Sequence, residues 1–369
     1  MIVVGEASGD AHAAELVRSL RKIEPETRFE FFGSTGPKLR ALGVETIVSA
    51  DDFAVVGIVE IARVLPMFWN AFRLLRKTAE VRKPDAVILV DFPEFNLKLA
   101  RTLKQRSTAK IIYYISPQIW AWRKYRARTI RNDVDLLLTI LPFEKDWYAE
   151  RGINNVEYVG NPLVGKIAFQ NDKDAFCKKY GFDSERPLVA LLPGSRGTEI
   201  RHILPEMVRT ARLMREVQPN IQFVIAAAEG KAEVIKEMTD LIVVNNETYD
   251  VLNAADAAAV ASGTATLETG MIGTPMVVVY KGTELNNKIL RPLISVEHFG
   301  LINLVAEERI VSELIQDKFT AETLSKELFS LLEPKRNAEV REELRTATAK
   351  LGDGDASKLA AEAVIREIG

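Results

Sequence analysis

The sequence contains little of what disulfide-bonded and metal-binding proteins use most. Its 369 residues include one cysteine, Cys177, and three histidines, His12, His202 and His298. A single cysteine excludes an intramolecular disulfide and a cysteine-rich zinc or iron–sulfur site, and it fits a reducing cytoplasm. The histidines are too scattered for a spaced ligand motif, and no DxD-like carboxylate pair follows an expected strand. We therefore expect no metal site.

A strong charge excess and a long apolar run are also missing. The 49 Lys and Arg residues and 51 Asp and Glu residues leave a net charge of −2, which does not indicate a nucleic-acid partner. No segment reaches the ~18 consecutive apolar residues of a membrane-spanning helix. Glu60 and Arg63 interrupt the best candidate, residues 55–69. The apolar strand expected at residues 2–4 has no basic segment before it, so we expect no signal peptide.

What the sequence does contain is the composition and periodicity of an α/β protein. Hydrophobic residues make up 47% and charged residues 27%, which is typical of globular domains. Short apolar runs alternate with segments of helical period almost from end to end, as parallel sheets with crossover helices require. The expected strands are residues 2–4, 28–32, 86–90, 110–115, 135–140, 156–159, 188–192, 222–226, 241–244, 257–261 and 276–280.

The length exceeds one domain of ~100–200 residues, so we expect two doubly wound, Rossmann-like domains. A polar segment that follows Gly160-Asn161-Pro162 marks the boundary. We assign residues 1–165 to the N-terminal domain and 166–340 to the C-terminal domain. Residues 341–369 are expected to form a C-terminal helix that crosses back or is exchanged with a second copy in a homodimer. Because doubly wound domains bind ligands at the carboxyl ends of their strands, a site is expected there, in the cleft between the domains.

A glycine loop in the second domain lies directly after an expected strand. Gly194, Ser195 and Arg196 follow residues 188–192 and precede a helix. Backbone N–H groups at a helix N-terminus bind phosphate, and a guanidinium is suited to phosphate oxygens. The alternative interpretation is an ordinary turn in which Ser195 or Thr198 caps the helix.

A second loop in the same domain has the same arrangement. Ser262, Gly263 and Thr264 follow an expected strand, and Glu268 lies about one turn into the next helix. A carboxylate there can accept hydrogen bonds from ribose hydroxyls, and two phosphate-binding helix termini in one domain indicate a pyrophosphate. The alternative is N-capping by Ser262 or Thr264, with Glu268 complementing the helix dipole.

The first expected strand is followed by a loop at residues 5–10. The loop lacks the G-x-G-x-x-G spacing of a dinucleotide site, so NAD binding is not indicated. Glu6, Ser8 and His12 are instead candidate polar groups of a pocket for a sugar or a lipid head group.

Asp91 follows the strand expected at residues 86–90 and precedes several aromatic residues. A carboxyl at the end of a strand, near apolar groups, can acquire a raised pKa and act as a general base. The alternative is structural, because Asp91 with Glu94 three residues later also fits a helix capping box.

Residues 116–123 combine two indoles, Trp120 and Trp122, with a basic segment. Tryptophan beside cationic groups suits a boundary between water and lipid, or an anionic head group. The alternatives are buried tryptophans followed by a solvated basic face, and a nucleic-acid site, which the net negative charge disfavours. The basic side chains that follow are Arg123, Lys124, Arg126, Arg128 and Arg131.

Residues 55–75 contain more apolar side chains than one core-facing helix stripe needs. The surplus would form an exposed patch of the kind that contacts membranes or partners. The alternative is a helix that is buried on both sides. The candidate patch consists of Val55, Ile58, Ile61, Leu65, Phe68, Trp69 and Phe72.

Together these motifs resemble the lipid A disaccharide synthase family of glycosyltransferases. The resemblance implies a GT-B fold of two Rossmann-like domains, in which the C-terminal domain holds most of the donor. It implies inverting transfer of 2,3-diacylglucosamine from UDP-2,3-diacylglucosamine to 2,3-diacylglucosamine 1-phosphate (lipid X), with a β-1,6 linkage formed and UDP released. The motifs, in family order, are residues 5–10, 56–60, 91–96, 116–123, 141–145, 191–196 and 261–268.

The same resemblance implies where the protein works and what each candidate residue does. The enzyme would be peripheral on the cytoplasmic face of the inner membrane, contact the lipid surface, and use no metal or other cofactor. Asp91 would be the base, and Arg196 would stabilise charge on the diphosphate. The donor residues would be Gly194, Ser195, Arg196, Ser262, Gly263, Thr264, Glu268 and Asn303. The acceptor residues would be Glu6, Ser8, His12, Glu94, Asn96, Ser116 and Trp120.

Two other functions remain open at this point. One is another GT-B-fold enzyme acting on a UDP sugar, such as a peptidoglycan N-acetylglucosaminyltransferase or a UDP-N-acetylglucosamine 2-epimerase. The tryptophan motif and the surplus apolar helix argue against a soluble epimerase. The other is a non-catalytic nucleotide-binding protein at a membrane surface, in which Asp91 and Glu94 only cap a helix.

Overall fold

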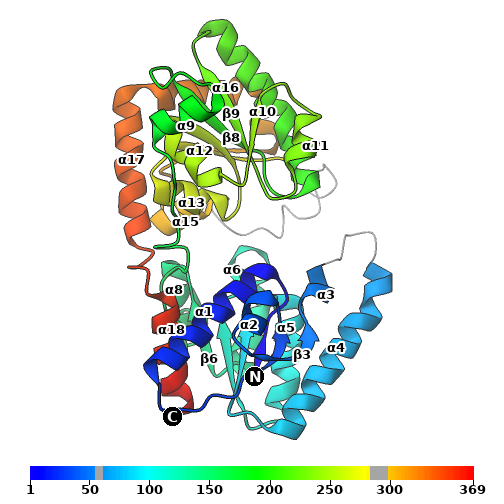
Figure 1. Cartoon of the computed structure of the whole chain (residues 1–369). Coiled ribbons are helices and arrows are strands. Elements are labelled where there is room, and N and C mark those ends of the chain that lie inside the picture. The colour runs from blue at the N-terminus through cyan, green and yellow to red at the C-terminus, as the bar shows by residue number, and fades with distance from the viewer. Residues whose placement is uncertain (55–60, 283–297) are drawn as a thin grey trace. The chain divides into compact units, whose positions relative to one another are not determined.

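The computed structural model describes residues 1–54, 61–282 and 298–369. This part of the chain forms two compact units, each built around one parallel sheet (Figure 1). Unit 1 comprises Met1–Pro162 together with Gly352–Gly369, and unit 2 comprises Leu163–Leu351. Both units are doubly wound α/β domains, which confirms the predicted fold class.

The sheet of unit 1 has seven parallel strands in the order β3-β2-β1-β4-β5-β6-β7. The central strands are nearly continuous apolar runs because helices bury both of their faces. From β1 the strand order continues in both directions, so a topological switch point lies between β1 and β4. The strands are β1 (Ile2–Val3), β2 (Phe32–Thr35), β3 (Glu45–Ser49), β4 (Ala86–Val90), β5 (Lys110–Tyr114), β6 (Leu136–Thr139) and β7 (Val156–Tyr158).

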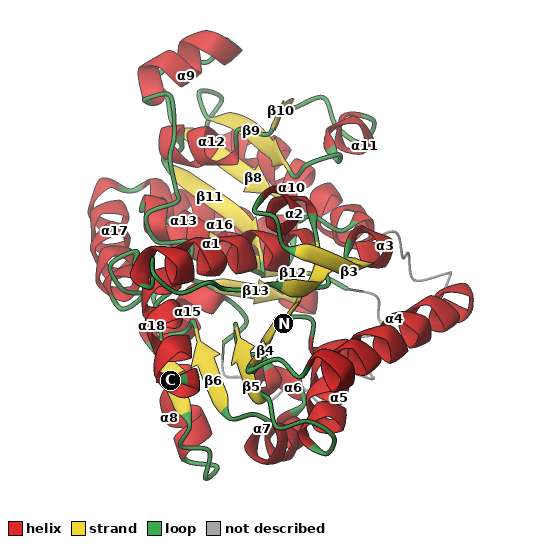
Figure 2. Cartoon of the chain, turned by 60° about the horizontal axis from the view of Figure 1, so that its bottom comes forward, coloured by secondary structure: helices red, strands yellow, loops and turns green. Residues whose placement is uncertain are grey.

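Helices cover both faces of this sheet. α1 and α18 lie on one face, and α4, α5 and α7 lie on the other (Figure 2). The helices of unit 1 are α1 (Ala7–Ile23), α2 (Pro37–Ala41), α3 (Asp51–Ala54), α4 (Ile61–Arg82), α5 (Pro93–Lys104), α6 (Ile119–Trp122), α7 (Ala127–Asp133), α8 (Pro142–Ala149) and α18 (Ala356–Ile368).

The last helix of the chain, α18, belongs to unit 1. It packs on α1, and ion pairs join Glu367 to Lys110 (2.8 Å) and Arg366 to Glu157 (2.6 Å). Residues 341–349 are not part of this segment, because they continue α17 of unit 2. The chain therefore returns to unit 1 only from Gly352 onward.

The sheet of unit 2 has six parallel strands in the order β10-β9-β8-β11-β12-β13, with its switch point between β8 and β11. The strands are β8 (Leu188–Leu192), β9 (Gln222–Ala227), β10 (Ile242–Asn245), β11 (Ala257–Ala261), β12 (Met276–Tyr280) and β13 (Glu313–Ile315). The helices are α9 (Lys173–Tyr180), α10 (Gly197–Val217), α11 (Ala232–Lys236), α12 (Thr248–Ala254), α13 (Ala265–Ile272), α15 (Leu301–Ala306), α16 (Ala321–Leu332) and α17 (Pro334–Ala349).

The expected strands differ from the observed ones mainly at the sheet edges. β3 and β13 were not expected; both are edge strands, and β13 has only three residues. A short, partly exposed edge strand carries little of the apolar pattern from which strands are predicted. The strand expected at residues 28–32 begins instead at Phe32 and continues to Thr35.

Candidate active site

The turn after β4 holds Asp91 in an unusual backbone conformation. Asp91 has φ 47°, Phe92 has φ 52°, and Ile115 at the end of the neighbouring β5 has φ 66°. Left-handed conformations cost non-glycine residues about 1–3 kcal/mol and cluster at functional sites. The carbonyl oxygen of Asp91 accepts hydrogen bonds from Tyr113 Oη (2.6 Å) and Asn96 Nδ2 (2.7 Å), which hold the turn in place.

The carboxyl of Asp91 lies beside the loop that follows β1. Burial raises its pKa, the charge of Glu6 raises it further, and the backbone N–H of Phe92 opposes this shift. Glu6 and Asp91 are brought together because β1 and β4 are adjacent at the switch point. A half-buried carboxyl with a raised pKa is a stronger base than an ordinary aspartate once it is deprotonated.

An aromatic cluster, consisting of Phe53, Phe68, Phe72, Phe92 and Phe95, lies behind this turn. The ring of Phe92 lies 5.5 Å from that of Phe95 and 6.1 Å from that of Phe68 on α4. It also lies directly on Gly5, where an added Cβ would come within 2.3 Å of the ring. The glycine of the first loop is therefore needed for the close approach of Phe92.

The cluster corrects the predicted apolar patch. Phe68 and Phe72 are half-buried and contact Phe95 with ring centroids 6.4 and 5.7 Å away, so they face the interior of unit 1. Leu65 and Trp69 are exposed, at 62% and 67%. Val55 and Ile58, and the side chain of Ile61, lie outside the described residues.

Three of the predicted acceptor residues are buried beneath the surface. Asn96 is fully buried, and its amide nitrogen donates hydrogen bonds to the carbonyl oxygens of Val90 and Asp91. Ser116 and Trp120 are also buried. Ser116 Oγ lies near Tyr148 Oη, and Trp120 Nε1 donates to Glu144, so both polar groups have partners inside unit 1. Contact of these three residues with the acceptor stays a prediction.

The remaining predicted acceptor residues lie nearer the surface. Glu6 and Ser8 are exposed, and His12 is half-buried on α1. Glu94 is exposed and pairs with Arg123 and with Arg126 (2.6 Å for the latter). Partial burial acts to raise the pKa of Glu94, but the hydrogen bonds and charges of these two arginines hold it below its ordinary value.

A buried polar cluster beside Trp120 includes Glu144, which lies in the motif at residues 141–145 but was not predicted as a site residue. Glu144 is almost fully buried, accepts a hydrogen bond from Trp120 Nε1 (3.0 Å), and accepts the backbone N–H of Leu141 (3.0 Å). Ser116 Oγ lies 2.8 Å from Tyr148 Oη beside it. Burial raises the pKa of Glu144 to about 7 despite these hydrogen bonds. Its position at the start of α8, after a proline, is a recognisable helix-start signal.

Unit 2 brings the two predicted phosphate loops together. β8 and β11 are neighbours, with Leu192 opposite Val260. The loops line a pocket of about 280 Å³, in which the predicted residues are Gly194, Ser195, Ser262, Gly263, Thr264 and Glu268. Gly194 has φ 105° and Gly263 has φ 151°, conformations that side chains disfavour. The loops precede α10 and α13, so backbone N–H groups at two helix N-termini lie beside the pocket.

The side chain of Arg196 lies outside the lining of this pocket. It is 82% exposed, and its guanidinium pairs with Glu199 at 3.2 Å. Glu199 lines the pocket and accepts the backbone N–H of Arg196 (3.3 Å), so it caps α10. Sequence reasoning missed Glu199, although a glutamate at the third helical position is a capping signal.

Glu268 lies at the junction of this pocket with a second one. The second pocket has a volume of about 400 Å³ and shares Ala228, Thr248 and Glu268 with the first. Tyr249 Oη donates a hydrogen bond to Glu268 Oε1 at 2.8 Å. Tyr249 was not predicted as a site residue, because nothing in its local sequence indicates this contact across two helices.

Asn303 has a structural position that differs from the predicted ligand contact. It is fully buried, and its Nδ2 donates to the Val311 carbonyl and to Glu313 Oε1 (both 2.9 Å). Its Oδ1 accepts the backbone N–H groups of Ile310 and Val311 (both 3.0 Å). The amide is thus saturated by the protein and has no group left for a nucleotide.

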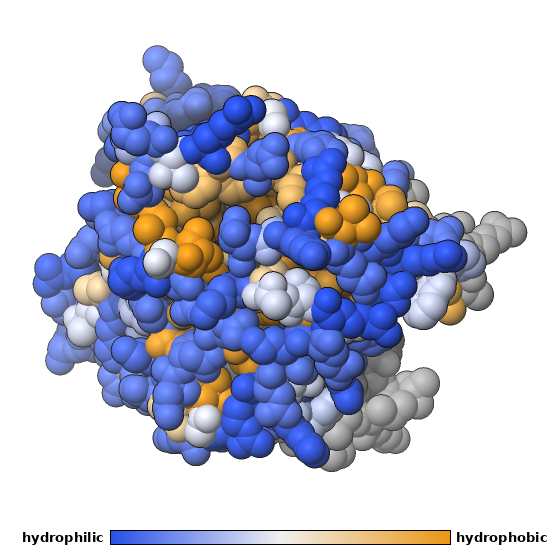
Figure 3. Space-filling model, turned by 90° about the horizontal axis from the view of Figure 1, so that it is seen from below, coloured by the Kyte–Doolittle hydropathy of each residue, from blue (hydrophilic) through white to orange (hydrophobic). Residues whose placement is uncertain are grey.

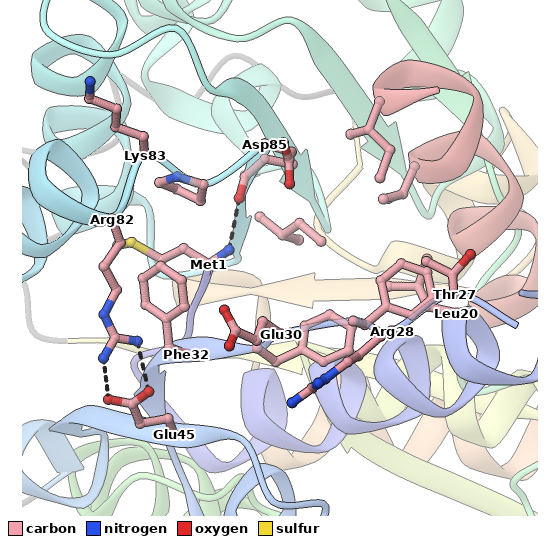
Figure 4. A pocket seen from close by; sticks show the side chains of 17 residues that line it. Met1, Leu20, Thr27, Arg28, Glu30, Phe32, Glu45, Arg82, Lys83 and Asp85 are labelled. Atoms are coloured by element: carbon pink, nitrogen blue, oxygen red, sulfur yellow. Dashed lines mark hydrogen bonds and ion pairs between the residues drawn. The ribbon is translucent and has the colours of Figure 1, made fainter. Parts of the chain in front are cut away.

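A third cavity belongs to unit 1. It lies at the amino-terminal ends of the strands of that sheet, whereas Asp91 follows the carboxyl end of β4. It has a volume of about 990 Å³, and its described lining contains none of the predicted site residues (Figure 4). Arg82 pairs with Glu45 (2.6 Å) and lies 4.7 Å from the ring centre of Phe32 there. The surface seen from this side is mainly hydrophilic, with small hydrophobic areas between the polar groups (Figure 3).

Two further features bear on cofactors and membranes. Within residues 1–54, 61–282 and 298–369, no three His, Cys, Asp or Glu side chains are grouped so that they could hold a metal ion. In the same ranges, no helix combines the length and the apolar character that crossing a bilayer requires.

The fold, with two doubly wound units that each contain one parallel sheet, is that of the GT-B class of glycosyltransferases. The structure is similar to the glycotransferase of kitacinnamycin, with a TM-score of 0.63, 16% identity, and coverage of 100% of this chain and 98% of that one. It is also similar to the UDP-GlcNAc 2-epimerase from Neisseria meningitidis bound to UDP-GlcNAc. For that enzyme the TM-score is 0.64, with 11% identity and 97% of each chain covered. At these identities the likeness concerns the fold.

The chain belongs to the lipid-A-disaccharide synthetase family, whose model matches residues 1–367. It is 42% identical to the lipid-A-disaccharide synthase of Syntrophus aciditrophicus over 369 residues, which covers 98% of this chain and 95% of the relative. It is 38% identical to that of Geobacter metallireducens over 376 residues, covering 100% of this chain and 97% of the relative. The protein is therefore a glycosyltransferase.

Proposed function

We propose that this glycosyltransferase moves 2,3-diacylglucosamine from its UDP conjugate to the 6-hydroxyl of 2,3-diacylglucosamine 1-phosphate. The product is the β-1,6-linked disaccharide 1-phosphate, and UDP is released. Family membership supports the choice of substrates. The observation that carries the chemistry is Asp91, a half-buried carboxyl of raised pKa held in a left-handed turn beside Glu6.

In the proposed step, Asp91 accepts the proton of the acceptor's 6-hydroxyl as the oxygen attacks the anomeric carbon of the donor. The new C–O bond forms as the bond from that carbon to the diphosphate oxygen breaks, and the electron pair leaves with UDP. Attack opposite the leaving group inverts the α-linked donor into a β-linked product. Glu6 contributes by keeping Asp91 a stronger base than it would be alone.

The loops of unit 2 are proposed to stabilise the charge that develops on the diphosphate. The backbone N–H groups near Ser195 and Thr264 begin α10 and α13 and are oriented before the reaction. Preorganised dipoles of this kind usually supply the largest part of the catalytic effect. Arg196 would add a cation after its guanidinium leaves Glu199, since the two are paired in this structure.

With this arrangement, we propose that no divalent metal is needed. The leaving group's negative charge would be balanced by two helix termini and one guanidinium. In this proposal unit 1 supplies the base and unit 2 supplies the loops that hold the diphosphate.

We also propose that the protein is peripheral on the cytoplasmic face of the inner membrane. Both proposed substrates carry acyl chains, so the enzyme must work where those chains remain in lipid. Leu65 and Trp69 on α4 are exposed apolar groups, and Trp122 and Tyr125 are exposed beside a basic segment. Exposed aromatic groups next to cations suit the boundary of an anionic bilayer.

A homodimer formed by exchange of the C-terminal helix is a further proposal. α18 packs on α1 and forms ion pairs with Lys110 and Glu157, and the same contacts would form if two copies exchanged α18. Sedimentation equilibrium tests this, and a concentration-independent monomer would contradict it.

The proposed function is tested by mass spectrometry of the products. Purified protein is incubated in detergent micelles with UDP-2,3-diacylglucosamine and 2,3-diacylglucosamine 1-phosphate. We expect a disaccharide 1-phosphate and one UDP for each disaccharide. A UDP-sugar epimer without disaccharide would favour an epimerase. UDP binding without any product, with the acyl chain lengths varied, would overturn the proposed acceptor.

A further inference from the structure

Tyr249 and Glu268 join two helices at the carboxyl edge of the unit 2 sheet. Tyr249 lies in the first turn of α12, and Glu268 lies in the first turn of α13. The phenol Oη donates to Glu268 Oε1 at 2.8 Å. Both side chains are half-buried, so this hydrogen bond is partly shielded from water.

Glu268 has one carboxylate oxygen left for another donor. Oε1 is occupied by Tyr249, and Oε2 accepts no hydrogen bond from any residue that the structure describes. Burial and the charge of Glu268 raise the pKa of Tyr249 above its ordinary range. The phenol therefore stays protonated and remains a donor, which leaves the orientation of the carboxylate fixed and Oε2 free.

The two pockets that meet at Glu268 differ in charge. Among the described residues, the second pocket is lined by four carboxylates and by no lysine or arginine; the carboxylates are Glu229, Glu247, Asp250 and Glu268, of which Glu247 is paired with Lys179. The first pocket is lined by only two, Glu199 and Glu268, and lies beside the backbone N–H groups of two helix N-termini. Such a pocket repels phosphate but accepts an uncharged group that carries hydroxyls. A diphosphate at the helix termini of the first pocket would thus place its nucleoside on the side of the second, with the ribose next to Glu268.

We propose that Tyr249 is a positioning residue that orients Glu268, so that its free oxygen accepts a hydrogen bond from a ribose hydroxyl of the nucleotide. This rests on the proposed function, because it presupposes a nucleoside diphosphate at the phosphate loops. Tyr249 acts through Glu268 and does not touch the reacting atoms. The pair thereby makes the site specific for ribonucleotides over deoxyribonucleotides.

The test measures the dissociation constants of UDP, 2′-deoxy-UDP and 3′-deoxy-UDP by isothermal titration calorimetry. A hydrogen bond to a charged acceptor changes an equilibrium about tenfold. We expect wild type to bind UDP about tenfold more tightly than the analogue that lacks the contacted hydroxyl. Tyr249→Phe should weaken UDP binding several-fold, leave that analogue unchanged, and so reduce the preference. Glu268→Ala should abolish the preference for UDP over the deoxy analogue. Adding Tyr249→Phe to Glu268→Ala should then leave the dissociation constant of UDP unchanged.

The matched control is Tyr280→Phe, which removes a phenol hydroxyl from unit 2 outside both pockets. It should leave all three dissociation constants unchanged. If Tyr249→Phe weakens UDP and both deoxy analogues equally, Tyr249 only shapes the pocket and the inference is wrong. An unchanged ratio of UDP to deoxy-analogue affinity in Tyr249→Phe also overturns it. Failure of wild type to bind UDP at all would overturn the proposed donor itself, and this inference with it.

Discussion

Glu6 and Asp91 are far apart in the sequence, yet the charge of Glu6 adds to the larger effect of burial in raising the pKa of the Asp91 carboxyl. They come together because the strands that precede them, β1 and β4, are neighbours at the switch point of the unit 1 sheet. The backbone of Asp91 is left-handed and is held by Tyr113 and Asn96. A like charge therefore acts on the Asp91 carboxyl, while two hydrogen bonds to the Asp91 backbone carbonyl hold the turn that carries it.

The pair predicts a change in the pH dependence of turnover. A base works when deprotonated, so kcat/KM rises with pH as Asp91 loses its proton. Because burial and, to a lesser extent, the charge of Glu6 raise that pKa, Glu6→Gln should move the acidic limb to lower pH. The maximal rate should fall modestly, since the base becomes weaker. The measurement is a pH–rate profile, with Glu150→Gln as an exposed control. A limb that stays in place, or moves to higher pH, contradicts the coupling.

The apolar patch predicts which side chains matter for membrane contact. Leu65→Ser with Trp69→Ser should weaken sedimentation with anionic liposomes and leave the unfolding free energy nearly unchanged, because both side chains are exposed. Val217→Ser, which alters an equally exposed apolar residue of unit 2, is the control. Equal effects of the patch and control variants, or sedimentation as strong as wild type, would refute the membrane assignment.

Phe68→Ser tests the interior side of the same helix. Phe68 lies in the aromatic cluster, so its loss should lower the free energy of unfolding by about 2–3 kcal/mol, less than for a fully buried phenylalanine. Urea denaturation measures this. A free energy of unfolding that is unchanged would place Phe68 in the exposed patch after all.

Glu144 predicts a pH dependence of stability. Burial raises its pKa in the folded state from 4.5 to about 7, so the folded protein binds this proton more tightly than the unfolded chain does. The resulting stability is complete below the unfolded pKa and is lost as the pH rises through the folded pKa. Between pH 4 and 8 the free energy of unfolding of wild type should fall relative to Glu144→Gln by about 3 kcal/mol. A difference between the two proteins that does not vary with pH would contradict this.

The proposed charge stabilisation predicts the effect of chelation. Turnover should be unchanged in excess EDTA, because helix termini and Arg196 balance the leaving charge in the proposed mechanism. Loss of activity in EDTA that added Mg²⁺ restores would show that a divalent cation carries this role.

Much of the site could be predicted because parallel sheets gather the carboxyl ends of their strands at one edge. Asp91, Gly194 and Gly263 each follow an apolar run and begin a helix, which is visible in a short window of sequence. The loop glycines are also recognisable, since positive φ angles and close approaches require them.

The remainder depends on contacts between distant segments. Tyr249 and Glu144 acquire their partners, Glu268 and Trp120, only when separate helices pack together. Asn303 looked like a ligand group, but its amide is saturated by a backbone segment that follows it. Whether the Phe68 side chain faces the core or the surface could not be predicted either, because the sequence of a helix that is apolar on more than one side does not show which side packs inward.

The most direct test of the proposed mechanism is the turnover rate of Asp91→Asn, measured together with its affinity for UDP and its thermal unfolding. Asparagine keeps the size of the side chain but cannot accept the proton from the 6-hydroxyl. We expect kcat to fall by about 10²–10⁴-fold, with UDP affinity and unfolding unchanged. Turnover close to wild type would contradict the role of Asp91 as the base. Loss of folding alone would show that Asp91 serves only the structure of the turn before α5.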